Sequence, residues 1–493
     1  MRKLLLASAA ALGASVGTMG FASAQTTNLP PAVLEGVPMA PQSVPGANNN
    51  NNYQAPMLPP GPTANPVPGS IVVRVNARVI FYGAVESSSL DKTAGTGPEN
   101  TGAAKLNPYT TLGYMRLYFG MDGMATNGLR YGAAIEIRQN FGYATGSSSN
   151  NQSSNNTFSE TLYVRRAFGY LAGDKWGIIR GGQGDGPFGI FDNGITTGQA
   201  YDDGGWNGDL PAAIPGNAQV TFPYMSQQGA EYGSSKIVYL SPQLAGFDLG
   251  LSYAPNNAAI QDGAQTVNLT NPTSTTLTGC SIAASGCYAL SSSSIDSDGA
   301  RFTNAYVAAL RYQGTFGPVG ILAYGGYMGS GHVDYTGEYV SPAATPTYKN
   351  LSFGQGGAAV TIGPVTLNGA IIGGAVNGIG ALQPSGGVHA VSWMGGATYS
   401  TGPFTIGASY YQYDSQGSPA MVGISQRHED AFAAGMTYGI APGLVLWVSY
   451  LYGTRHQGDY NFATGAAGTP SDPQYGYNNV KSQAAAIGTM IKW

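Results

Sequence analysis

The chain has 493 residues, of which 9% are charged and 43% hydrophobic, and its formal net charge is −4. A soluble globular chain carries about 25% charged residues, so ordinary soluble domains are disfavoured. After the N-terminal segment, no apolar run reaches the roughly 18 residues of a membrane-spanning helix, and the acidic balance does not fit nucleic-acid binding. With 74 glycines and 32 tyrosines, the composition is typical of a protein whose apolar residues alternate with small polar ones.

The first segment, 1–24, has the features of an export signal. Arg2 and Lys3 precede an apolar, Ala-rich run, and an A-x-A pattern ending at Ala24 precedes Gln25. Small residues at these positions are typical of a signal-peptidase site, which predicts cleavage after Ala24. Export then leaves 19 of the 21 basic residues against 25 acidic ones.

The next segment, 25–69, is rich in Pro, Asn and Ala, and Glu35 is its only charged residue. Such a composition cannot bury a hydrophobic core, so we predict a disordered or extended periplasmic leader. A tether without specific function and a periplasmic anchor or plug segment are both compatible with it.

From residue 70 to 493, apolar and polar side chains alternate with the period of a β-strand. Arg74, Asn76 and Arg78 share one face of such a strand, and valines fill the other. Similar alternation recurs at 114–121, 130–138 and 247–253. An apolar outer face and a polar inner face suit a transmembrane barrel with a wet interior, because a closed sheet pairs every backbone group in lipid.

Seven short turns alternate with eight long polar connections along this region. The short turns are predicted at Asp122–Gly128, Ala172–Asp174, Ser241–Gly246, Gly314–Pro318, Gly363–Pro364, Thr401–Pro403 and Ile440–Gly443. Fifteen connections join 16 strands, and an even number puts both ends of the barrel on the side of the short periplasmic turns. The sequence therefore predicts an all-β fold, a 16-stranded antiparallel transmembrane β-barrel with long extracellular loops, wide enough for an aqueous channel.

The chain ends on an alternating strand that closes with an aromatic residue. Ile487, Ile491 and Trp493 fall on one face of this strand. The pattern resembles the C-terminal signal of outer-membrane barrels, although Thr489 departs from the hydrophobic residue usual at its position.

Two segments resemble the general diffusion porins of Gram-negative bacteria. The stretch 236–253 has a strand ending in Tyr-x-Ser-Pro that turns through Gly-Phe into a strand ending in Tyr. The stretch 165–183 is similar to the strand pair before the family's third loop. The resemblance covers about 71–493. It implies a trimeric outer-membrane porin, open to passive diffusion of small hydrophilic solutes and ions, whose third loop folds inward and narrows the barrel.

The site residues follow from this implied constriction. The third loop carries five acids, namely Asp185, Asp192, Asp202, Asp203 and Asp209. The basic wall would contain Arg78, Arg116 and Arg165 near half height, Arg74 and Arg130 lower, and Arg138 higher. A basic wall opposite an acidic loop would set up a transverse field that discriminates ions. We favour Asp192, Asp202 and Asp203 over the acids at the ends of the loop.

An alternative is that these arginines are scattered lumen residues paired with acids on neighbouring strands, such as Glu136 beside Arg138. Arg166 alternates with Arg165 and is expected to face outward, where a bare charge in lipid costs about 2–4 kcal/mol. We therefore hypothesise that Arg166 lies in the subunit interface of a homotrimer.

The two cysteines, Cys280 and Cys287, both fall in the fourth long connection. Export places them in an oxidising compartment, which predicts a disulfide at the loop tip. No histidine is near them in sequence, so no metal site is predicted.

Two other functions stay open. A substrate-selective channel for sugars or an anion would use an aromatic track, and the tyrosines that would contribute are Tyr114, Tyr118, Tyr163, Tyr411 and Tyr413. An adhesin or structural barrel would use its loops.

An enzyme is not expected, because none of the four histidines, His332, His389, His428 and His456, adjoins a recognisable nucleophile motif. The sequence implies no cofactor, and it leaves ion selectivity undecided.

Overall fold

The fold is that of a computed structural model of the full chain. The structure describes residues 66–90, 107–141, 162–173, 175–192, 194–196, 205–216, 218–225, 234–256, 302–332, 348–378, 380–417, 426–463, 466–467 and 475–493. The predicted signal peptide, most of the predicted leader, and both cysteines lie outside these residues, so the cleavage site and the disulfide stay predictions.

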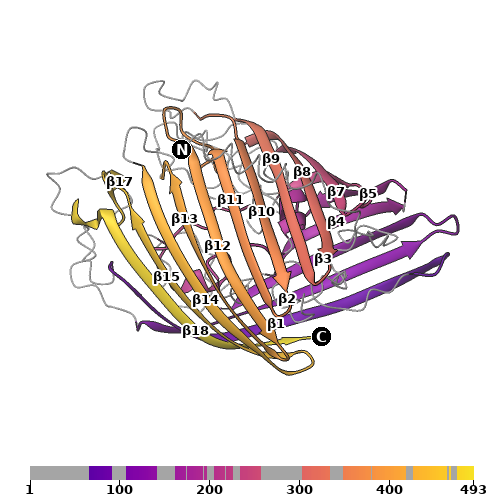
Figure 1. Ribbon diagram of the computed structural model, residues 1–493, viewed down its shortest axis with the longest axis horizontal. Coiled ribbons are helices and arrows are strands. Elements are labelled where there is room, and N and C mark those ends of the chain that lie inside the picture. Colours follow the sequence, from indigo (N-terminus) through magenta and orange to yellow (C-terminus); the bar gives the residue numbers. More distant parts are fainter. Residues whose placement is uncertain are drawn as a thin grey trace, which may run out of the picture.

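Sixteen strands close into one antiparallel barrel, and each strand pairs with its neighbours along the chain (Figure 1). They are β1 (Ser70–Ser88), β2 (Tyr109–Met124), β3 (Arg130–Phe141), β4 (Tyr163–Gly173), β5 (Gly177–Gln183), β6 (Ser235–Leu240), β7 (Phe247–Asn256), β8 (Phe302–Phe316), β9 (Val319–His332), β10 (Ser352–Ile362), β11 (Val365–Ala375), β12 (Ala390–Thr401), β13 (Phe404–Ser415), β14 (Arg427–Ala441), β15 (Leu444–His456) and β18 (Asn479–Lys492). The predicted 16-stranded barrel is confirmed. Two further short strands, β16 (Tyr460–Asn461) and β17 (Ala466–Ala467), pair with each other within the last long connection.

The last strand closes the barrel against the first. The register between β1 and β18 runs from Arg78 opposite Lys492 to Ser88 opposite Ser482. One residue further, Trp493 and Ala77 exchange two backbone hydrogen bonds of 3.2 Å. The C-terminal aromatic is thus joined to the first strand, as closure of a sheet without free edges requires.

The alternation read from the sequence sets the two faces of the wall. Val73 and Phe81 on β1 are exposed outward, while Ile80 and Tyr82, on either side of Phe81, are buried on the lumen side. One predicted turn was too long: Asp122 lies inside β2, on the lumen side, and the turn before β3 begins at 125. Ends of elements are the least certain part of such predictions, since strand alternation continues into polar residues when they face water.

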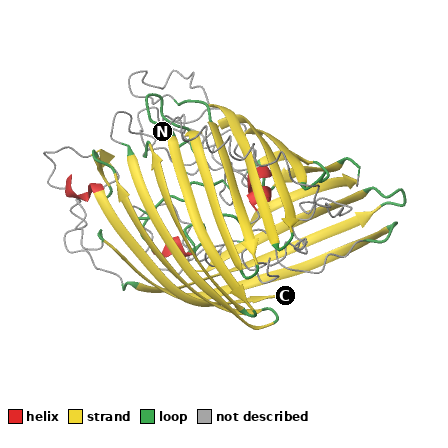
Figure 2. Cartoon of the chain, viewed as in Figure 1, coloured by secondary structure: helices red, strands yellow, loops and turns green. Residues whose placement is uncertain are grey.

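The long connection after β5 folds inside the barrel, as predicted for the third loop. Its helix α2 (Pro187–Asp192) packs on β7, β8 and β9, and its 3-10 turn η5 (Leu210–Ala213) packs on β1 and β18. Figure 2 shows both helical turns within the outline of the barrel. Among the described residues, helices are short, and none is long and apolar enough to cross a bilayer.

Candidate constriction site

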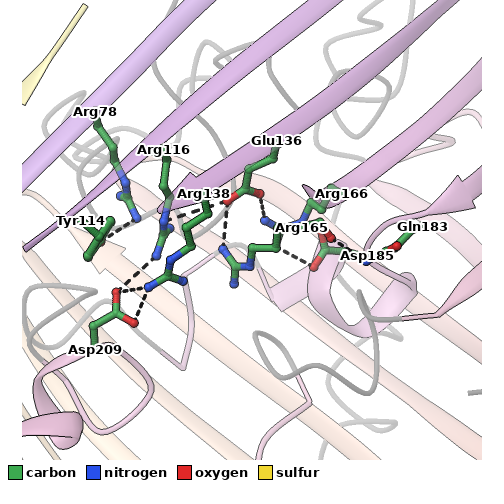
Figure 3. A network of polar contacts seen from close by, with 10 residues as sticks. All are labelled: Arg78, Tyr114, Arg116, Glu136, Arg138, Arg165, Arg166, Gln183, Asp185 and Asp209. Carbon is green, nitrogen blue, oxygen red and sulfur yellow. Dashed lines mark hydrogen bonds and ion pairs between the residues drawn. The ribbon is translucent and has the colours of Figure 1, made fainter. Parts of the chain in front are cut away.

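A row of arginines crosses the lumen side of the first three strands. Arg78 on β1 is directly opposite Arg116 on β2, and Arg116 is directly opposite Arg138 on β3. All three are buried, at 3–7% exposure. Like charges on directly paired residues repel one another, so this row needs compensating groups (Figure 3).

An aromatic ring supplies the first compensation. The guanidinium carbons of Arg116 and Arg138 each lie 4.6 Å from the ring centre of Tyr114, and that of Arg78 lies 5.6 Å away. Arg78 also donates a hydrogen bond to the Tyr114 hydroxyl at 3.1 Å. The negative face of the ring attracts each cation, and because Tyr114 sits two residues before Arg116, alternation brings both to the lumen.

A carboxylate from the third loop supplies the second compensating group. Arg138 Nη2 lies 2.5 Å from both carboxylate oxygens of Asp209, and Arg116 Nη2 lies 3.5 Å from one of them. Burial alone would raise the pKa of Asp209, but Arg138 and Arg116 outweigh it and hold that pKa well below its usual range. Asp209 is therefore ionised and joins the third loop to the arginine row, that is, to Arg78, Arg116 and Arg138. We call its contact with Arg116 and Arg138 the Asp209 latch.

Glu136 on β3 connects this row to two more arginines on β4. Its carboxylate accepts hydrogen bonds from Arg165, at 3.1 Å, and from Arg166. Arg116 Nε lies further away, at 3.9 Å. Glu136 is only 3% exposed, so its charge is balanced by the guanidinium groups and not by water. The paired-acid alternative is thus correct in kind, but the partners of Glu136 are on β2 and β4 and not Arg138.

The expected outward orientation of Arg166 was wrong. Glu136 pairs with Arg166 and Ile137 pairs with Val164, so Arg165 is an extra residue in β4, a β-bulge. A bulge shifts the alternation by one residue and re-aims the side chains around it. Both Arg165 and Arg166 therefore point into the lumen, at 7% and 3% exposure, and Arg166 gives no support to a subunit interface.

Arg166 fastens the root of the third loop. It donates to Asp185 through Nε at 2.5 Å and Nη2 at 3.1 Å. Two other basic residues hold backbone carbonyls beside it: Arg180 donates to the carbonyl of Asp185, and Lys236 donates to that of Gly184 at 2.8 Å. The loop thus turns inward immediately after β5.

The preference for the central acids of the loop stays a prediction, because Asp192 is the only one of the three that the structure describes. Asp185 and Asp209, at the two ends, meet the arginines. Asp192 lies instead at the end of α2, where Thr196 donates to it through its hydroxyl at 2.9 Å and Tyr324 donates at 3.3 Å. Burial raises the pKa of Asp192 to about 7, although hydrogen bonds from Thr196 oppose this effect. Asp202 and Asp203 lie outside the described residues.

The two lower arginines are separate from the row. Arg74 Nε donates to Asp122 at 2.7 Å, and the Tyr170 hydroxyl donates to the same carboxylate. Arg130 begins β3 at the periplasmic end and is partly exposed. Neither residue takes part in the contacts with Asp209, so the arginine row holds only part of the predicted basic wall.

On other strands of the barrel, glycines that face the lumen leave room for side chains of the third loop. A Cβ added at Gly250 would lie 2.9 Å from Phe191, one at Gly357 would lie 2.9 Å from Ile195, and one at Gly453 would lie 2.8 Å from Trp206. Any larger residue would displace the loop side chain. We call Gly250, Gly357 and Gly453 the glycine sockets.

Hydrogen bonds on the same walls add to the sockets. Trp206 Nε1 donates to the carbonyl of Phe432 at 2.9 Å. The hydroxyl of Tyr411 donates to the carbonyl of Thr221 at 3.0 Å, and that of Tyr413 donates to Gly378 at 3.0 Å. These two tyrosines, which an aromatic track would have used, hold connections in place.

A closed barrel whose charged lumen is narrowed by an inward-folded loop defines a transmembrane channel. Residues 70–458 match the model of the Gram-negative porin family. The chain belongs to that family, and it is a channel of the outer membrane through which solutes diffuse. The search of curated proteins found no match.

The chain is also similar to solved porin structures. An anion-selective porin from Comamonas acidovorans is 13% identical, with a TM-score of 0.47. A triple mutant of Rhodopseudomonas blastica porin is 14% identical, with a TM-score of 0.44. Each comparison covers 86% of this chain and 100% of the other.

Proposed function

We propose that the arginine row and Asp209 form the constriction of a channel that passes small hydrophilic solutes and ions without cofactor or covalent chemistry. The observation that carries this is the Asp209 latch, which joins the third loop to Arg116 and Arg138 across the lumen side of β2 and β3. A permeating solute would pass beside fixed charges in a narrow space, where they act most strongly.

Planar-bilayer recording tests this role. The double substitution of Arg116 and Arg138 by alanine removes the charges and frees the loop, so we expect a larger single-channel conductance and a changed reversal potential in a salt gradient. Lys481→Ala is the matched control, since Lys481 is an exposed basic residue of β18. Unchanged conductance and reversal potential in the double variant would place the constriction elsewhere.

One observation favours an anion-selective channel as the second candidate. Among the described residues, the carboxylates of Glu136, Asp185 and Asp209 are outnumbered by six guanidinium groups and one ammonium group, those of Arg78, Arg116, Arg138, Arg165, Arg166, Arg180 and Lys236. A positive excess in a narrow site lowers the energy of anions there. A reversal potential that shows cation selectivity of the wild type would exclude this candidate.

We also propose that the chain is exported with cleavage after Ala24 and forms a homotrimer. The outer face of β3, β4 and β5 supports a close contact, because Ala133, Gly169 and Gly181 are paired across these strands and form a row of small residues. Small residues allow two surfaces in a membrane to approach.

Mass spectrometry of the mature protein would test the cleavage: an N-terminus other than Gln25 would contradict it.

Two tryptophan substitutions test the trimer. No heavy atom lies within 4 Å of a Cβ placed at Gly181 or at Gly395 on β12, so both barrels should fold with tryptophan there. We expect Gly181→Trp to abolish an SDS-resistant trimer on semi-native gels and Gly395→Trp to leave it intact. Equal behaviour of the two variants would contradict an interface on the early strands.

A further inference from the structure

We propose that the Asp209 carboxylate occupies a binding site for small organic carboxylates, and that carboxylates from the medium compete with it for Arg116 and Arg138. This inference rests on the proposed constriction. It adds a ligand class and assigns Asp209 a new part, that of an internal competitor.

The geometry of the site is that of a carboxylate receptor. One nitrogen of Arg138 contacts both oxygens of the bound carboxylate at 2.5 Å, and Arg116 approaches one oxygen at 3.5 Å from the neighbouring strand. Guanidinium groups fixed by a rigid sheet and by the ring of Tyr114 are preorganised for a planar anion, which lowers the entropic cost of binding.

The charge of the site is not balanced by Asp209 alone. Three guanidinium groups surround Tyr114, and one carboxylate is in contact with two of them. Glu136 lies closer to the arginines of β4, at 3.1 Å from Arg165, than to Arg116, at 3.9 Å. Among the described residues around Tyr114, guanidinium groups outnumber carboxylates, so a dicarboxylate in place of Asp209 would bring a second negative charge to a basic site.

Asp209 is also the member of the site that can leave most easily. Its side chain is 26% exposed, against 4% for Arg116 and 7% for Arg138. Asp209 is the N-cap of η5, yet its side chain makes no capping hydrogen bond. Rotation of that side chain would release the arginines without unwinding η5, whose Leu210 stays fully buried. Exchange thus costs one ion pair and not the fold of the loop.

Competition makes a prediction about the size of the effect, since the loss of one negative charge from the site also favours anions. An internal carboxylate on a short tether acts at an effective concentration of millimolar or more, so its removal should tighten binding of an external carboxylate. We expect succinate to interrupt the single-channel current of Asp209→Asn at about one tenth of the concentration that the wild type needs. Asp459→Asn, which removes a carboxylate of the last long connection, should behave as the wild type.

Two comparisons make the result decisive. Succinamide, the neutral diamide of the same shape, should leave the current of every variant unchanged, and the double alanine substitution of Arg116 and Arg138 should lose the effect of succinate. Unchanged or weaker succinate binding in Asp209→Asn, or an equal effect of the diamide, would overturn the proposal.

Calorimetric titration of the detergent-solubilised barrel with succinate separates this inference from the channel function. Tighter binding to Asp209→Asn without any effect on current would keep the carboxylate site and reject the constriction. An altered conductance in the double alanine variant, with no measurable succinate binding to the wild type or to Asp209→Asn, would keep the constriction and reject the site.

Discussion

The third loop is held in two different ways on the two sides of the barrel. On β2, β3 and β4, charged side chains hold it: Arg166 binds Asp185, and Arg138 binds Asp209. On β7, β10 and β15 the glycine sockets hold it by shape, with hydrogen bonds such as that from Trp206 to Phe432. The ionic side fixes where charge lies in the lumen, and the socket side fixes how deep the loop sits.

The two attachments should fail differently. Removal of one partner from a buried ion pair leaves an uncompensated charge and costs about 3–5 kcal/mol. Overfilling a packed site costs about 1–3 kcal/mol, because neighbouring side chains can shift. The free energy of unfolding should thus be more sensitive to single substitutions on the ionic side. On the socket side, the loss of stability should increase with the volume that the substitution adds.

The largest effect is expected for Arg166→Met. The substitution keeps the length of the side chain but leaves Asp185, which is fully buried, without its closest cation. We expect a loss of about 3–5 kcal/mol in the free energy of unfolding, measured by denaturant titration in detergent.

The double variant Arg166→Met with Asp185→Asn is the control for this ion pair. It removes both charges of this pair, so the part of the loss that is due to Asp185 should be recovered, while Glu136 keeps Arg165 and Arg116. A double variant as unstable as Arg166→Met alone would show that Asp185 is not the group left unbalanced.

A smaller effect is expected for Gly453→Val on the socket side. The added Cβ would lie 2.7 Å from Val220 and 2.8 Å from Trp206, so the loop must move off β15. We expect a loss of about 1–3 kcal/mol and a red shift of tryptophan emission as Trp206 becomes exposed. Gly395→Val, on the open outer face, is the control, and an equal shift there would contradict the socket.

The difference between the two sides also separates what the sequence could predict from what it could not. Alternation and turn spacing predicted the strands and the lumen positions of Arg78, Arg116 and Arg138, because each depends on local order along the chain. The inward fold of the third loop was instead implied by the resemblance to porins. The orientation of Arg166 depends on a bulge, which changes the alternation through pairing with β3 and leaves no local signal.

The sockets show the same limit. Gly250, Gly357 and Gly453 do not differ from other glycines in sequence, and their role depends on side chains that arrive from elsewhere in the chain. The contacts of Asp185 and Asp209 show a related limit: distance along a loop of this length does not say which carboxylate meets the wall. Only Tyr114 had a readable signal, since it alternates with Arg116 on one face.

The effect that is spread over several pH units, and the one that best isolates the socket side, is the pH dependence contributed by Asp192. The fold raises the pKa of this third-loop carboxyl from 3.8 to about 7, so the folded protein binds its proton more tightly than the unfolded chain does. Its contribution to stability is therefore fully present below about pH 4 and is lost as pH rises toward 7, at no more than about 1.4 kcal/mol per pH unit.

Asp192→Asn removes this proton and keeps the shape of the side chain. The difference in free energy of unfolding between Asp192→Asn and the wild type should grow in favour of the variant between pH 4 and 7 and be constant above. Denaturant titration across that range measures it. The ionic side should not add to this difference, because the arginines keep the pKa of Asp209 below the range. A difference that stays flat from pH 4 to 7 would mean that Asp192 remains ionised, and that α2 is held by charge in the same way as the opposite end of the loop.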